Sequence, residues 1–155
     1  MISIRAADQP GDRVFMLAQS PRLAAGIAPR SHSGAEIAAF QERFTRESLE
    51  EAPEGALTIM AMDGSERLGF LHAVPSRDEI TGEPAAYVAL LVVVEAAQGQ
   101  GVADRLMRAA EDWARARGLS RLCLDVFDSN ERARQFYARA GFRADTIRLV
   151  KRIER

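Results

Sequence analysis

Hydrophobic and polar positions recur along the chain with two periods, and together they predict its elements. Alternating or continuous apolar residues predict strands over 2–5, 56–62, 68–74, 86–94 and 121–127, with one or two more from Phe142 onward. Helical spacing predicts helices after Pro10 and over about 33–50, 101–117 and 130–140. The stretch bounded by Pro21 and Pro29 is expected to be irregular, and 75–84 to be a polar loop. The expected order, β-α-α-β-β-β-α-β-α-β, is an α/β fold around a mixed sheet.

Two local signals fix element boundaries within this pattern. Ser33-Gly34-Ala35-Glu36 is typical of a capping box, in which a serine and a glutamate three residues later cap a helix start reciprocally. Asp63-Gly64 joins two predicted strands, and this dipeptide favours the tight hairpin turns that need positive φ. We therefore expect a helix from about Ser33 and a hairpin around Asp63.

Composition narrows the classes of protein to which the chain can belong. Its 155 residues suit one domain, spanning 1–155, and its net charge of −1 gives no support for a nucleic-acid partner. Cys123 is the only cysteine, which excludes an internal disulfide and favours a reducing compartment. The longest apolar run, Ala85 to Val94, is too short to span a bilayer, and the first residues lack the apolar run of a signal peptide. We expect a cytoplasmic protein with no membrane partner, and the sequence gives no reason to expect a metal.

A glycine-containing loop, Gln98-Gly99-Gln100-Gly101-Val102-Ala103, lies between a predicted strand and a predicted helix. Backbone N–H groups at a helix N-terminus bind phosphates, and glycines allow a bulky group to approach. No Gly-Lys-Ser/Thr follows, so the loop is not a P-loop, and Asp104 replaces the third glycine of a dinucleotide fingerprint. From the loop alone, a phosphate site and a plain tight turn remain open.

The residues around this loop resemble the Gcn5-related N-acetyltransferase (GNAT) family. The resemblance rests on Leu91-Val92-Val93-Val94, on the spacing Gln98-x-x-Gly101-x-Ala103, on Asn130, and on the segment Ala133 to Phe142. It is strong from about Tyr87 to Phe142, and before Ile59 it rests on element order alone. It implies the GNAT fold, with acetyl-CoA as co-substrate and no metal.

The resemblance also implies a cofactor site, residue by residue. The central strand and the next one would splay apart, with pantetheine pairing with the backbone of Val92, Val93 and Val94. The loop backbone would hold the pyrophosphate of CoA, Asn130 would bond the cofactor arm, and Tyr137 would face the sulfur. The loop residues concerned are Gln98, Gly99, Gln100, Gly101, Val102 and Ala103.

Acetyl transfer from a thioester to an amine needs a base, a donor for the oxyanion and a proton for the thiolate. Tyr137 is the predicted acid, against the alternative of a core aromatic residue. Many family members place a glutamate early in the central strand, where this chain has Tyr87. Asp125 resembles the base of ribosomal-protein N-terminal acetyltransferases and is the predicted base; a purely structural hydrogen bond is the alternative. His72, Glu83 or a water chain are further candidates for the base.

The function predicted from the resemblance is N-acetylation of a primary amine by direct attack in a ternary complex. A small-molecule acceptor is favoured over a protein N-terminus or lysine. The acceptor pocket is expected from segments 21–34 and 75–84, in which no acidic cluster indicates a polycation. A non-catalytic acyl-CoA sensor or partner-binding module, and a nucleotide-binding domain, are the rival hypotheses. A homodimer through 147–153 is also expected from the resemblance.

Overall fold

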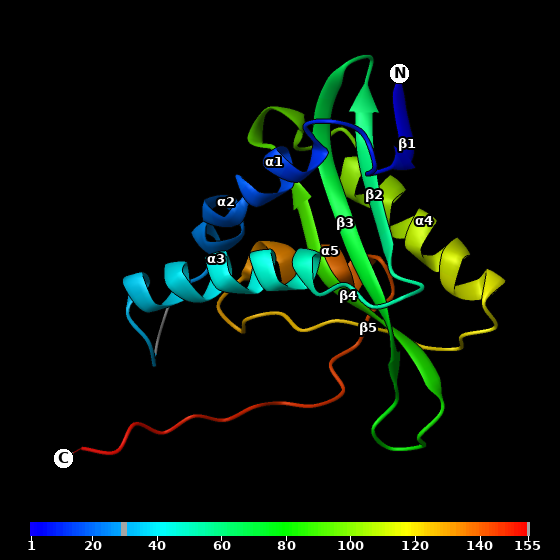
Figure 1. Ribbon diagram of the computed structural model, residues 1–155. Coiled ribbons are helices and arrows are strands. Elements are labelled where there is room, and N and C mark those ends of the chain that lie inside the picture. Colours follow the sequence, from blue (N-terminus) through cyan, green and yellow to red (C-terminus); the bar gives the residue numbers. More distant parts are fainter. Residues whose placement is uncertain (29–30, 155) are drawn as a thin grey trace.

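The computed structural model describes residues 1–28 and 31–154. Figure 1 shows one sheet with helices on both of its faces. The elements are, in order, β1 (Ile2–Ala6), α1 (Asp12–Leu17), α2 (Ser20–Ala25), α3 (Gly34–Glu50), β2 (Leu57–Asp63), β3 (Glu66–Arg77), β4 (Pro84–Val93), a short 3₁₀ helix (Glu95–Ala97), α4 (Val102–Ala116), β5 (Leu122–Cys123) and α5 (Glu131–Arg139). The predicted α/β class with a mixed sheet is confirmed.

The sheet has the strand order β1-β2-β3-β4-β5, in which the first four strands are antiparallel neighbours. Asp63 pairs with Glu66 across a two-residue turn, and Gly64 has a φ of +58°, so the predicted hairpin is confirmed. The capping box is confirmed too: the Ser33 hydroxyl accepts from the Glu36 N–H, and the Glu36 carboxylate accepts from the Ser33 N–H.

Each face of the sheet has its own apolar core. On one face, helices α1 to α3 pack against the sheet around Phe70, which is fully buried, and Met60. On the other face, α4 packs through Leu106 and Met107 against strand residues such as Leu71. Burying each of these side chains stabilises the fold by roughly 1.5–3 kcal/mol relative to leaving it exposed. Helices therefore cover both faces of the sheet, and we expect a functional site at its loops and strand ends.

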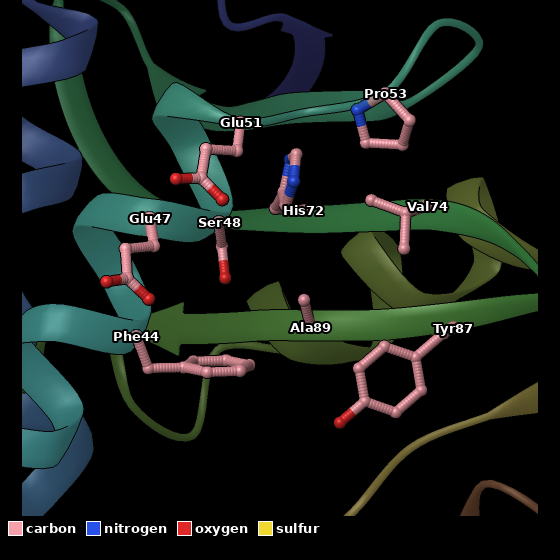
Figure 2. A pocket seen from close by; sticks show the side chains of 9 residues that line it. All are labelled: Phe44, Glu47, Ser48, Glu51, Pro53, His72, Val74, Tyr87 and Ala89. Atoms are coloured by element: carbon pink, nitrogen blue, oxygen red, sulfur yellow. The ribbon is translucent and has the colours of Figure 1, made fainter.

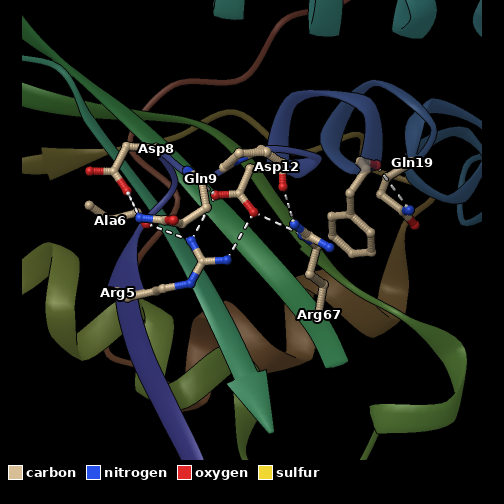
Figure 3. A network of polar contacts seen from close by, with 9 residues as sticks. Arg5, Ala6, Asp8, Gln9, Asp12, Gln19 and Arg67 are labelled. Carbon is tan, nitrogen blue, oxygen red and sulfur yellow. Dashed lines mark hydrogen bonds and ion pairs between the residues drawn. The ribbon is translucent and has the colours of Figure 1, made fainter. Parts of the chain in front are cut away.

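A buried carboxylate ties the first helix to the sheet (Figure 3). Asp12, at the start of α1, is 1% exposed and accepts from Arg5 of β1 at 2.7 and 2.9 Å and from Arg67 of β3 at 2.8 Å. It also accepts from the Gln9 N–H at 2.9 Å. These hydrogen bonds hold the pKa of Asp12 well below its usual value, although burial opposes them.

Three sequence predictions are wrong. The stretch expected to be irregular after Pro21 contains α2, in which proline occupies the first turn, where its missing N–H costs nothing. The strand expected over 121–127 is only Leu122–Cys123. Among the described residues, none after Phe142 forms a strand: Ile147 and Leu149 are 79% and 88% exposed, and the segment extends away from the sheet in Figure 1. The predicted dimer contact through this segment stays a prediction. Pro29 lies outside the described residues.

The loop expected over 75–84 is shorter than predicted, since β3 continues to Arg77 and β4 begins at Pro84. No helix in the described part of the chain is both long and apolar enough to cross a membrane.

Candidate active site

Strand β4 has an open edge along its second half. It pairs with β5 only at Ala86 and Tyr87, and runs on to Val93 without a strand partner on that side in the described chain. The Val94 N–H donates to Leu68 of β3, so by alternation the backbone groups of Val93 face the open side. The Val93 carbonyl there accepts from Arg22 Nε at 3.0 Å. Of the three valines predicted to meet pantetheine, Val93 is therefore the one whose backbone is presented to a ligand.

The glycine loop lies at the end of this open edge and leads directly into α4. Gly99 and Gly101 have φ values of +78° and +77°, in the left-handed region that favours glycine. Gly101 is the N-cap residue of α4 and provides no side-chain cap, so the N–H groups of the first turn are left for a ligand. Val102 is 1% exposed and anchors the helix start in the core.

The loop side chains take little part in this arrangement. Gln98 is half-buried and ends the 3₁₀ helix, while Gln100 is exposed and reaches only the Ala96 carbonyl, at 3.3 Å. Ala103 is half-buried within α4. A phosphate site in this loop would therefore be formed by its backbone and not by its side chains.

An irregularity in β4 shapes a pocket on the face covered by α3. His72 pairs with Leu90 and Ala73 with Val88, so Ala89 is an extra residue in β4. Such bulges bend a strand and are common beside active sites. The pocket next to it has a volume of about 280 Å³ and is shown in Figure 2. Its lining comes from the end of α3 and from β3 and β4: Phe44, Glu47, Ser48, Glu51, Pro53, His72, Val74, Tyr87 and Ala89.

Tyr87 connects the pocket to the predicted base. Its hydroxyl donates to Asp125 Oδ2 at 2.7 Å. Burial raises the pKa of Tyr87, and the hydrogen bond to the Asp125 carboxylate raises it further. Asp125 is exposed and lies just beyond β5, so the expectation of a mid-strand carboxylate is wrong. The structure nevertheless joins this carboxylate to Tyr87, the residue that the resemblance aligns with the family's usual base.

His72 is the second titratable side chain of the pocket. It is fully buried, and Nδ1 lies 2.8 Å from the Thr58 hydroxyl. Nε2 is buried without a hydrogen-bond partner among the described residues. Burial lowers the pKa of His72, and the backbone of Ser48 opposes this effect in part, without forming a hydrogen bond to Nε2. Burial therefore favours the neutral form of the ring.

The two predicted residues of α5 have different surroundings. Tyr137 packs between Phe136 and Phe142, and burial raises its pKa to about 12. It lies near enough to Tyr87 to raise the pKa of that phenol. Asn130 caps α5 by accepting from the Ala133 N–H at 3.4 Å. This hydrogen bond gives Asn130 a structural function whether or not it also meets a cofactor.

Sequence reasoning missed two carboxylates and overvalued a third. Glu47 and Glu51 lie on the pocket wall, whereas the acceptor pocket was expected from 21–34 and 75–84. Their i, i+4 spacing was a visible signal, but it is common on solvated helix faces. Glu83, a candidate base, is instead paired with Arg121 at 2.8 Å on the surface.

Comparisons with known proteins agree with this geometry. The model of the acetyltransferase (GNAT) family matches residues 24–142. An aminoglycoside N(6')-acetyltransferase type 1 from Klebsiella aerogenes is 36% identical over 92 residues, covering 58% of this chain and 60% of that protein. N-alpha-acetyltransferase 30 from Schizosaccharomyces pombe is 39% identical over 56 residues, covering 36% of this chain and 37% of that protein. These two matches thus span less than two thirds of each relative's length.

Solved structures share the fold over nearly the whole chain. A putative acetyl transferase from Pyrococcus furiosus has a TM-score of 0.80 at 23% identity, covering 99% of this chain and all of that one. AAC(6')-Iy, in complex with the bisubstrate analogue CoA-S-monomethyl-acetylneamine, has a TM-score of 0.67 at 18% identity, covering 100% and 99%. With a family model that spans most of its length and a matching fold, this chain belongs to the GNAT family of acetyltransferases.

Proposed function

We propose that the chain transfers the acetyl group of acetyl-CoA to a primary amine by direct attack within a ternary complex. The observation that carries this proposal is the course of β4. It passes from the pocket at Tyr87 and Ala89, along an edge with which no strand of the described chain pairs, to the turn that begins α4. One strand thus connects a site for an acceptor with a site for phosphates.

The described residues fit the cofactor at both ends of this open edge. The uncapped first turn of α4 would hold the pyrophosphate by N–H groups and by the helix dipole. The outward backbone groups of Val93 would meet the pantetheine amides, with Arg22 giving up its contact to the Val93 carbonyl. When bound, acetyl-CoA supplies the thioester that the amine attacks.

Asp125 and Tyr87 would remove the proton that the attacking nitrogen must lose. Because the Tyr87 hydroxyl donates to Asp125, its oxygen is left to accept from the amine. As the nitrogen bonds to the acetyl carbon, its proton passes to Tyr87 and the phenol proton to Asp125, so no charge is left on the phenol. His72, whose Nε2 has no hydrogen-bond partner among the described residues, is the alternative acceptor of this proton.

Tyr137 would complete the reaction at the sulfur. With a pKa of about 12, its phenol stays protonated across the range in which amines react. It can therefore donate to the departing thiolate as the carbon–sulfur bond breaks. No covalent enzyme intermediate is needed.

A small-molecule acceptor suits the pocket better than a folded protein. Its volume of about 280 Å³ lies just below the usual range for small-ligand sites, roughly 300–1,000 Å³. Relatives named as aminoglycoside acetyltransferases support the same preference.

The experiment is to incubate the purified chain with acetyl-CoA and a panel of primary amines, and to follow release of free thiol. We expect release that depends on both the enzyme and the amine. Tight binding of acetyl-CoA with no release over any amine would favour the rival hypothesis, a non-catalytic acyl-CoA sensor.

A further inference from the structure

The pocket wall formed by α3 carries an excess of negative charge. Glu47 lies in the last turn of the helix, and Glu51 is its C-cap residue, one turn later. Both line the pocket, and neither carboxylate has a hydrogen bond or ion pair with the described residues. No lysine or arginine lines the pocket among those residues.

A buried histidine on β3 also lines the pocket. His72 is fully buried on β3, and its Nε2 has no partner in the described chain. Leaving a buried polar atom unpaired costs about 1–3 kcal/mol, so such atoms in native structures call for an explanation. When Nδ1 carries the ring proton and donates to the Thr58 hydroxyl, Nε2 is the acceptor that a ligand can satisfy. Figure 2 shows the His72 ring beside Glu51 and Ser48.

We infer that this pocket binds a second ammonium group of the acceptor, held by Glu47, Glu51 and His72. The substrates would then be small molecules with at least two amino groups, one acetylated and one bound. This inference rests on the proposed function, because it places the reacting amine at Tyr87 and the second amine at the α3 end of the same pocket.

The chemistry of the three groups matches a primary ammonium. An –NH₃⁺ group has three donors and no acceptor, whereas two carboxylates and a neutral imidazole nitrogen offer only acceptors here. The low pKa of the buried His72 keeps its ring neutral, so it does not repel the cation. Phe44, Val74 and Ala89 provide an apolar surface for the methylene groups between the two amines.

The test compares two probes with the same five-carbon chain, n-pentylamine and 1,5-diaminopentane. Thiol release from acetyl-CoA is the readout. We expect the diamine to have the lower KM. Glu47→Gln and Glu51→Gln should each raise the KM for the diamine about threefold, and the double variant about tenfold, given that exposed pairs are weak. In these variants the KM for n-pentylamine should rise less than the KM for the diamine, because n-pentylamine has no second ammonium group. Salt should weaken diamine binding in the wild type more than in the double variant.

Glu54→Gln is the matched control. It removes the same charge from the connection between α3 and β2, shortly after Glu51, at a residue that does not line the pocket. We expect it to leave both KM values unchanged. Melting temperatures of all variants should agree within a few degrees, which shows that each is folded.

The outcomes separate this inference from the proposed function. Thiol release with equal KM values for both probes, unaffected by the double variant, would overturn the diamine site and leave the acetyltransferase intact. No release with any amine would overturn the proposed function. In that case calorimetric binding of 1,5-diaminopentane, lost in the double variant, would still support the cation site; equal binding by both proteins would overturn it.

Discussion

Replacing Gly101 tests the phosphate-binding turn more sharply than any change of a side chain. This residue begins α4 with a φ of +77°, and a Cβ placed on it would meet no atom within 4 Å. The cost of substitution is therefore set by the backbone and not by collision. For a residue with a Cβ, the left-handed conformation is higher in free energy by roughly 1–2 kcal/mol, and for a β-branched residue by more.

This cost converts directly into affinity. When the turn relaxes to a negative φ, its N–H groups no longer converge, and binding must restore the strained form. An alanine at Gly101 should therefore weaken acetyl-CoA binding about fivefold to thirtyfold, and Gly101→Val should abolish it in the usable concentration range. Exchanging Gln100 should have little effect, because its exposed side chain reaches only a neighbouring carbonyl.

Isothermal titration of each variant with acetyl-CoA provides the measurement. Gly34→Val is the control, because Gly34 also has open space around it but an ordinary φ, and it lies at the start of α3. A wild-type dissociation constant for Gly101→Val would refute the assignment of this turn to the phosphates. Loss of binding in Gly34→Val as well would show that the effect is not specific to the turn.

Three further predictions concern stability and chemistry. Asp12→Ala should destabilise the fold by about 3 kcal/mol and lower Tm by roughly 6–12 °C, because it leaves two arginines without their buried partner; unchanged Tm would contradict this. Since the folded-state pKa of Asp12 is depressed, its stabilisation is present above about pH 4 and is lost as pH falls below that value, which urea titrations of wild type and variant at several pH values can follow. Tyr137→Phe should lower kcat at least about tenfold with little change in acetyl-CoA affinity, and unchanged turnover would remove its assignment as the acid. Asp125→Asn should lower kcat, because the Tyr87 phenol then has no carboxylate to take its proton, and unchanged turnover would show that Asp125 is not the base.

Elements fixed by local signals could be predicted from the sequence. The capping box at Ser33 and the turn at Gly64 depend on residues within one turn of each other, so their sequence patterns suffice. The apolar alternation over 121–127 and 147–153 carries a preference for strand, but a strand forms only against a neighbour. In the described structure β4 pairs with only two residues of β5. The apolar residues that follow in both segments therefore have no neighbouring strand and form none themselves.

The site divides in the same way. The glycine loop and Tyr137 could be identified from the sequence because each lies in a short motif of neighbouring residues. Glu47 and Glu51 were not, because only the packing of α3 across the sheet brings them beside His72. The hydrogen bond between Tyr87 and Asp125 joins residues 38 positions apart. It depends on the position of β5 relative to β4, so it could not be predicted from the sequence either.

The most direct test of acetyl transfer is mass spectrometry of 1,5-diaminopentane after incubation with the purified chain and acetyl-CoA. We predict monoacetylated diamine and free CoA in equal amounts, with neither formed when the chain is omitted. Release of CoA without acetylated amine, or no release with this diamine or with any other amine of the panel, would contradict the proposal that this chain transfers the acetyl group to an amine.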